Sequence, residues 1–295
     1  MQQIIGGSLY YVKNSFAGSF FNALIDSALH QLIMDADFSL RFLGTEACDM
    51  DWSRYGEAGI YGSTQTLVNG TVLIDAGRTG FRSLGRFGVA PEAIEEVWFT
   101  HYHDDHCFPE EVAQLVLAHG VAAHPLVFRG TALLLEALSA ALPPECAAQA
   151  SWRPFAVGHA FETRGWTVTP LLANHEDDLY DNLPVHYLVE GAHSKFLYAL
   201  DGAWLTKKAR SALQGKRLDA IVWDATVERA GDWRIFEHND FGMIQTMVKA
   251  LVDAQIVDAN TKLVLDHLAR TLWRQPIRVP APYIVAEDGM ELCLP

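Results

Sequence analysis

The stretch THYHDDH, residues 100–106, follows the apolar run EVWF of residues 96–99. Valine, tryptophan and phenylalanine favour extended backbone, so the run predicts a strand and places the polar stretch in the loop at its carboxyl end. Three histidines and two aspartates fall within six residues: His101, His103, Asp104, Asp105 and His106. Imidazole and carboxylate are usual ligands of zinc and related divalent ions. A solvated turn also contains such residues by chance, but the spacing H-x-H-x-D-H favours a metal site.

Four more candidate residues stand where apolar runs end, on both sides of this loop. They are Asp75 in LIDAG, His175 in LLANHED, Asp201 in KFLYALD and His267 in KLVLDHL. Taken singly, an aspartate at a strand end is also a turn former, and a histidine there is also a strand cap. Their order along the chain, with residues 100–106 between them, makes chance a poor explanation.

This order of motifs resembles that of the metallo-β-lactamase superfamily of hydrolases. The resemblance covers most of residues 39–295. It implies an α/β fold, an αββα sandwich of two mixed sheets flanked by helices. We therefore expect residues 39–295 to form one metallo-β-lactamase-like hydrolase domain.

The resemblance also implies a dinuclear centre with two divalent ions, zinc or manganese, with iron as a further option. The implied ligands are His101, His103 and His175 for one metal, Asp105, His106 and His267 for the second, and Asp201 as the bridge. Asp75 would fix the ligand loop from behind. Two ions sharing an oxygen bridge lower the pKa of water, so a metal-bridged hydroxide attacks while both ions polarise the substrate. No G-x-S-x-G elbow of a serine hydrolase occurs in the chain.

Family members that open β-lactams generally lack the bridging aspartate, so Asp201 argues against a β-lactamase. The chain is more similar to the phosphoribosyl cyclic phosphate phosphodiesterase-like group. That similarity rests on VTPLLANH (168–175), AHSKFLYALD (192–201), the pair Trp223-Asp224 and the segment EHND (237–240). In that group the histidine of the last segment acts on the substrate, which makes His238 the implied general acid or phosphate ligand. Asp105 and His238 are the expected catalytic residues. Alternatively, His238 is only a residue at a helix start, with Asn239 or Asp240 as the cap.

The leading hypothesis is a dinuclear metal-dependent phosphodiesterase for a small phosphodiester, cyclic ones included. A metal-dependent hydrolase of a lactone, ester or thioester is the alternative, favoured if His238 points away from the centre. A non-hydrolytic redox or binding protein on the same scaffold is the third.

Several residues outside the ligand set could contact a substrate. Guanidinium groups suit phosphate, and five lie in loops that could reach the metals: Arg54, Arg78, Arg229, Arg234 and Arg270. Each could equally be a solvated charge. Trp204 follows the bridging aspartate and could either stack on a base or sugar or pack inside the protein.

Composition limits the partners. The chain has 22 Lys and Arg against 36 Asp and Glu, a net charge of −14, and no basic run. A long polyanion is disfavoured, so we expect a small-molecule substrate and no nucleic acid. The 4 cysteines form no C-x-x-C pair, which favours a reducing, cytoplasmic location. No stretch reads as a membrane span.

The remaining expectations concern the elements. Residues 1–38 are expected to form an N-terminal helical extension, because apolar residues from Phe21 to Ile33 recur on one helical face. That face would pack on its own domain, form a homodimer contact or attach to a membrane surface. Strands flank Asn69-Gly70, and a late hairpin is expected around Asp288-Gly289. Helices are expected over Glu110–His119, Thr131–Leu142, Thr206–Gln214 and Phe241–Gln255.

Overall fold

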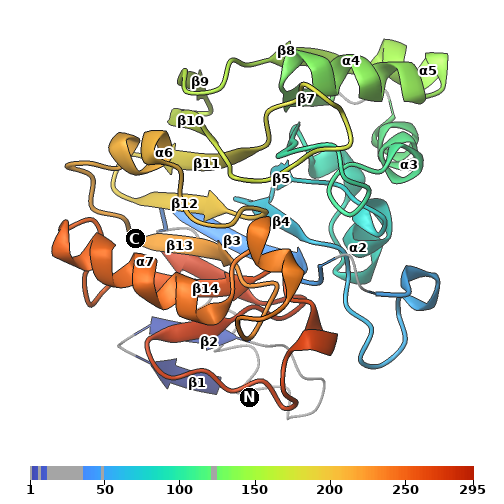
Figure 1. The fold of residues 1–295 in the computed structure, drawn as a ribbon. Coiled ribbons are helices and arrows are strands. Elements are labelled where there is room, and N and C mark those ends of the chain that lie inside the picture. Colours follow the sequence, from blue (N-terminus) through green and yellow to red (C-terminus); the bar gives the residue numbers. More distant parts are fainter. Residues whose placement is uncertain (1, 6–7, 12–35, 48–49, 121–124) are drawn as a thin grey trace, which may run out of the picture.

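Two β-sheets, of nine and seven strands, stack face to face with helices on their outer sides (Figure 1). The computed structural model describes residues 2–5, 8–11, 36–47, 50–120 and 125–295. The expected α/β sandwich is confirmed. Three apolar clusters explain the layering, because one contains residues of both sheets and each of the others joins one sheet to its helices.

The first sheet is antiparallel in its first half and parallel in its second. Its strands, in spatial order, are β1 (Gln2–Ile5), β2 (Ser8–Tyr11), β16 (Glu291–Leu294), β3 (Phe38–Gly44), β4 (Gln65–Val68), β5 (Val72–Ile74), β6 (Glu96–Trp98), β7 (Val127–Gly130) and β8 (Ser151–Pro154). The turn between β4 and β5 contains Asn69 and Gly70, both with positive φ, as the sequence predicts. Strands β5 to β8 are parallel, so β5 and β6 end at the same edge.

The second sheet contains the strands that precede His175, Asp201 and His267. Its order is β15 (Tyr283–Val285), β14 (Lys262–Asp266), β13 (Ala220–Asp224), β12 (Lys195–Ala199), β11 (Val185–Glu190), β10 (Trp166–Leu172) and β9 (Phe161–Thr163). Strands β12 to β15 are parallel, and β10 runs in the same direction because β11, between β10 and β12, is antiparallel to both. The carboxyl ends of β10, β12, β13 and β14 therefore share one edge.

The helices cover the outer faces. They are α2 (Gly80–Arg86), α3 (Pro109–His119), α4 (Ala132–Ala141), α5 (Pro144–Gln149), α6 (Lys207–Ala212) and α7 (Phe241–Asp253), with 3-10 turns η1 (Trp52–Arg54), η2 (Pro91–Ala93), η3 (Trp233–Phe236) and η4 (Arg270–Leu272). The four helices expected from the sequence are present. In Figure 1, α6 and α7 flank the second sheet, and α2 and α3 lie on the opposite side of the molecule.

The expected late hairpin is wrong. Strand β15 pairs with β14 in the second sheet, whereas β16 pairs with β3 in the first. The chain crosses between the sheets at Asp288, whose half-buried carboxylate accepts hydrogen bonds from Gly62 N (2.8 Å) and Thr45 Oγ1 (2.9 Å). Strand β15 thus pairs with the strand before it, whereas β16 pairs with a strand near the start of the described domain.

The N-terminal extension stays a prediction. The helix expected there falls on residues 12–35, which lie outside the described residues, while residues 2–5 and 8–11 form β1 and β2 beside β16. Across the described part of the chain, we find no helix with the length and apolar character of a membrane span.

Candidate metal centre

The candidate ligands come from both sheets and meet where the sheets' edges adjoin. Asp75 follows β5, and residues 101–106 follow β6, in the first sheet. His175, Asp201 and His267 follow β10, β12 and β14 in the second. The centre is therefore assembled across the seam of the sandwich, from loops at the carboxyl ends of strands.

One group of donor atoms contains His101, His103, His175 and Asp201. Nδ1 of His103 lies 3.0 Å from Nε2 of His101 and 3.1 Å from Nε2 of His175. Oδ2 of Asp201 lies 3.3 Å from Nε2 of His101 and 3.5 Å from Nε2 of His175. The structure thus brings together the residues expected at the first metal.

A second group contains Asp105, His106, His267 and again Asp201. The Nε2 atoms of His106 and His267 are 3.2 Å apart, and Oδ2 of Asp105 lies 3.4 Å from Nε2 of His267. Asp201 places Oδ1 2.9 Å from Nε2 of His267 and Oδ2 3.3 Å from Nε2 of His106. Its carboxylate therefore stands between the two groups, at the position that the sequence interpretation gives to a bridge.

The donor set fits divalent metal ions. Asp201 Oδ1 is buried and makes no hydrogen bond, although Nε2 of His267 lies 2.9 Å away, so it remains an available acceptor among the donor atoms. Burial lowers the pKa of His175 to about 4, which keeps its imidazole neutral, as a ligand must be. Burial acts to raise the pKa of Asp201, but the imidazoles of His267 and His106 outweigh it and hold that pKa well below its usual range. Nitrogen and carboxylate donors of this kind suit zinc, manganese and iron.

Three residues of the centre have a left-handed backbone. Asp75, Asp201 and His267 have φ of 64°, 51° and 52°. Non-glycine residues rarely adopt this conformation, and such strain concentrates at functional sites, where the surroundings enforce it.

Asp75 lies behind the ligand loop and is hydrogen-bonded to it. Its carboxylate is buried and accepts hydrogen bonds from Thr100 N and from Nδ1 of His106, both at 2.8 Å. Thr100 Oγ1 also donates to Asp75 and lies 3.0 Å from Nδ1 of His101. These contacts assign the Nδ1–H tautomer to both histidines and leave each Nε2 free to bind metal.

We expect Asp75→Asn to weaken metal affinity about 10- to 100-fold, the usual effect of removing such a support. The amide carries no charge and can present an N–H to Nδ1 of His106, which disturbs the tautomer. Competition with a chromogenic chelator measures the affinity. Asp219→Asn is the matched control. Asp219 is also a buried aspartate, but it accepts a hydrogen bond from Lys195 N, away from the centre. Equal affinities in the two variants would contradict the role of Asp75.

Asp224, to which the sequence interpretation gave no role, braces the other side of the centre. It ends β13, is fully buried, and its Oδ1 accepts a hydrogen bond from Thr226 Oγ1 at 2.7 Å. That hydroxyl lies 2.8 Å from Nδ1 of His267, so a chain of hydrogen bonds orients the ligand. A single aspartate at the end of a strand cannot be recognised as a site residue from its sequence spacing. The one indication is that the neighbouring parallel strands also end next to site residues.

His238 faces the centre. Its Nδ1 lies 2.9 Å from Oδ2 of Asp224 and 3.9 Å from Oδ1 of Asp201, and its ring stacks on that of His267 with centroids 5.4 Å apart. Burial acts to lower the pKa of His238, but the Asp224 and Asp201 carboxylates raise it above its usual value. The cap of α7 is Asp240, one of the two caps that the alternative interpretation named, and it accepts a hydrogen bond from Met243 N at 2.7 Å. What that interpretation does not account for is the contact of His238 with Asp224 beside the donor groups.

The five candidate arginines all pair with carboxylates. The pairs are Arg54 with Glu57, Arg78 with Asp104, Arg229 with Glu228, Arg234 with Asp232 and Arg270 with Glu46. Arg270 is itself buried and also donates to Thr45 O and Ala286 O, which ties the loop after β14 to the first sheet. For these side chains the structure favours structural pairing over phosphate binding.

The chain has a fold of the metallo-β-lactamase type, and its site gathers histidine and aspartate donors that could hold divalent metal ions. Residues 59–109, which include Asp75 and the loop 100–106, match the model of the family described as the metallo-beta-lactamase superfamily. None of the curated proteins matches the chain.

Solved structures share the fold over nearly their whole length. A diphosphatase from the PhnP family is 18% identical, with a TM-score of 0.65 over 88% of this chain and 100% of that one. Zn²⁺-bound PqqB from Methylobacterium extorquens is 16% identical, with a TM-score of 0.65 over 87% and 100%. The short form of human tRNase Z is 16% identical, with a TM-score of 0.61 over 87% and 99%. At these identities the likeness establishes the fold.

Proposed function

We propose that the protein is a dinuclear metal-dependent phosphodiesterase that hydrolyses a small phosphodiester, cyclic ones included. The observation that carries the proposal is the buried His238–Asp224 pair beside the ligand groups. The PhnP-family diphosphatase and the tRNase Z among the structural neighbours support a phosphoryl substrate.

The chemistry divides between the metals and the chain. Divalent ions, when bound, lower the pKa of water and polarise the phosphoryl oxygens. Asp201, together with the histidine ligands, would hold the ions. Asp224 accepts the hydrogen bond of Nδ1–H of His238 and, because its charge favours the protonated imidazole, leaves Nε2–H as the proton that can be donated. His238 can then protonate the departing alkoxide or steady a phosphate oxygen.

Charge supports a small substrate. The net charge is −14, and the arginines of the nearby loops are already paired with carboxylates. A long polyanion needs several free cations along its path, because its affinity comes largely from phosphate contacts.

We expect the purified protein to contain two divalent ions about 3.5–4 Å apart, the usual separation in two-metal hydrolytic sites. Two donor groups that share Asp201 are the reason. Elemental analysis gives the stoichiometry, and a crystal structure at saturating metal gives the separation and the ligands. One metal at saturation, or a ligand set without Asp201, would contradict the dinuclear arrangement.

A substrate panel tests the function itself. We would compare kcat/KM for a cyclic phosphodiester, a linear phosphodiester, a phosphomonoester, a lactone, a thioester and a β-lactam. The proposal expects a phosphodiester to be the best substrate. If the lactone or thioester is best, the alternative, a metal-dependent hydrolase of a lactone, ester or thioester, replaces it.

A further inference from the structure

Exposed aromatic side chains lie in the loops that carry residues of the metal centre. In the described ranges of the chain, four aromatic side chains are exposed: Tyr180 (94%), Trp204 (44%), Trp233 (65%) and Phe236 (79%). All four lie within five residues, along the chain, of His175, Asp201 or His238. Single exposed apolar residues are ordinary, but a group confined to the loops of one site indicates binding.

The topology puts these loops at one edge. They follow β10, β12 and β13, whose carboxyl ends share the edge from which His175 and Asp201 also project. The aromatic residues are therefore carried by the same loops that build the centre.

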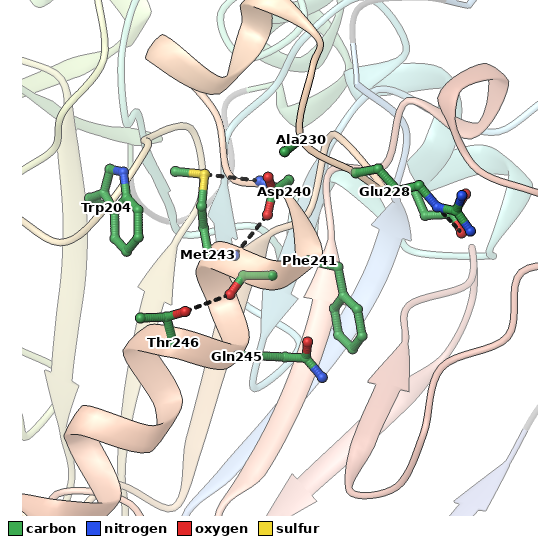
Figure 2. A pocket seen from close by; sticks show the side chains of 10 residues that line it. Trp204, Glu228, Ala230, Asp240, Phe241, Met243, Gln245 and Thr246 are labelled. Atoms are coloured by element: carbon green, nitrogen blue, oxygen red, sulfur yellow. Dashed lines mark hydrogen bonds and ion pairs between the residues drawn. The ribbon is translucent and has the colours of Figure 1, made fainter.

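A pocket of about 580 Å³ lies at this edge, across the first turn of α7. Figure 2 shows Trp204 at one end, Glu228 at the other, and Asp240 and Met243 between them. The pocket is open to solvent, so it can contact one face of a small organic ligand rather than enclose it. Asp240 follows His238 by two residues, so the pocket adjoins the centre along the chain.

Trp204 is held by its backbone while its indole stays accessible. The backbone N–H of Trp204 donates to Asn239 Oδ1 at 2.9 Å, and Nδ2 of Asn239 donates to Gly202 O at 2.8 Å. Its φ of 56° is a strained value for a bulky residue. A large ring with an enforced backbone and an exposed face is arranged for contact rather than for packing.

The polar lining indicates which part of a ligand fits. Glu228 and Asp240 supply carboxylates, each with one oxygen already bonded to a backbone N–H, of Arg274 and of Met243 respectively. The cation Arg229 lies 3.6 Å from Glu228 Oε1. The two carboxylates disfavour a phosphate group of the ligand in this pocket. They suit an uncharged ring whose edge carries N–H donors.

We propose that this pocket binds a planar heteroaromatic ring of the substrate, such as a nucleobase, stacked on Trp204 while the phosphodiester reaches the metal centre. The link to a phosphodiester rests on the proposed function, whereas binding of the ring does not. Aromatic stacking tolerates different bases, because every base has a π-face.

The test compares ligands that differ only in the ring. Calorimetry or ligand-observed NMR on the metal-loaded protein gives dissociation constants for adenosine, uridine and ribose, and for AMP and ribose 5-phosphate. We expect the ring-bearing ligand of each set to bind at least about 5-fold more tightly, and Trp204→Ala to weaken its binding roughly 5- to 150-fold. Trp204→Phe should retain most of the preference, whereas Trp204→Leu should lose it, because leucine is apolar but not aromatic.

Leu133→Ala, which removes an exposed apolar side chain on α4, is the control and should leave both sets unchanged. Equal binding of nucleosides and ribose, or a preference that survives in Trp204→Ala, overturns the ring pocket. A preference that depends on Trp204, found in a protein that hydrolyses no phosphodiester, supports the pocket and refutes the proposed function. Hydrolysis of phosphodiesters without any ring preference supports the proposed function and refutes the ring pocket.

Discussion

Asp201→Ala is expected to remove bound metal and to lower kcat by about 10³-fold or more. Both oxygens of this carboxylate lie near histidine nitrogens of the two donor groups, so its loss affects both metal positions. It also leaves the repulsion between two cations less screened. Several kcal/mol of transition-state stabilisation depend on such ions, and 1.36 kcal/mol corresponds to a factor of ten in rate.

Metal content and kcat should fall together, as measured by elemental analysis and by turnover of the best substrate of the panel. Asp201→Asn separates charge from shape, because it keeps the side chain's size but loses the anion. Asp181→Ala, in an exposed position, should change neither quantity. If Asp201→Ala retained two ions and near-normal kcat, Asp201 would not be the bridge.

His238→Ala is expected to act on chemistry and not on metal content. For a phosphodiester with a poor leaving group, kcat should fall roughly 10²- to 10⁴-fold, the range for a positioned acid. For a nitrophenyl phosphodiester the loss should be much smaller, because a stable leaving anion needs no proton. Steady-state kinetics on the two substrates, with metal analysis of the same samples, measures both effects.

His193→Ala, an exposed histidine, is the matched control and should be inert. Equal losses on the two substrates would assign His238 to phosphate binding instead of proton donation. No loss on either would leave His238 without a role and would favour the ester or lactone alternative.

The ligand groups were predictable because their signal is local. Residues 101–106 supply four of the seven ligands within one loop, and each remaining ligand follows an apolar strand whose direction brings its end to the same edge. The structure brings all seven expected ligands together. Asp224 was missed because a lone aspartate at a strand end looks like a turn former. Only the pairing of β13 between β12 and β14 reveals it.

The error at the late hairpin comes from long-range pairing. The sequence around Asp288 has the pattern of a hairpin, but the two strands join different sheets, and their partners are set by burial in the sandwich. Among the arginines, Arg54, Arg229 and Arg234 pair with carboxylates close to them in the sequence, whereas Arg270 pairs with Glu46, 224 residues away. No local pattern reports such a contact.

The left-handed backbone of Asp75, Asp201 and His267 implies a trade-off between durability and activity. Each such position costs a side-chain-bearing residue about 1–2 kcal/mol that glycine avoids. Glycine at these positions would relieve that backbone cost, but it would also remove the donors that the centre requires and, at Asp75, the acceptor of two buried hydrogen bonds. The strain and the donors belong to the same three residues, so a stabilised variant that keeps the reaction has to gain its stability elsewhere in the chain.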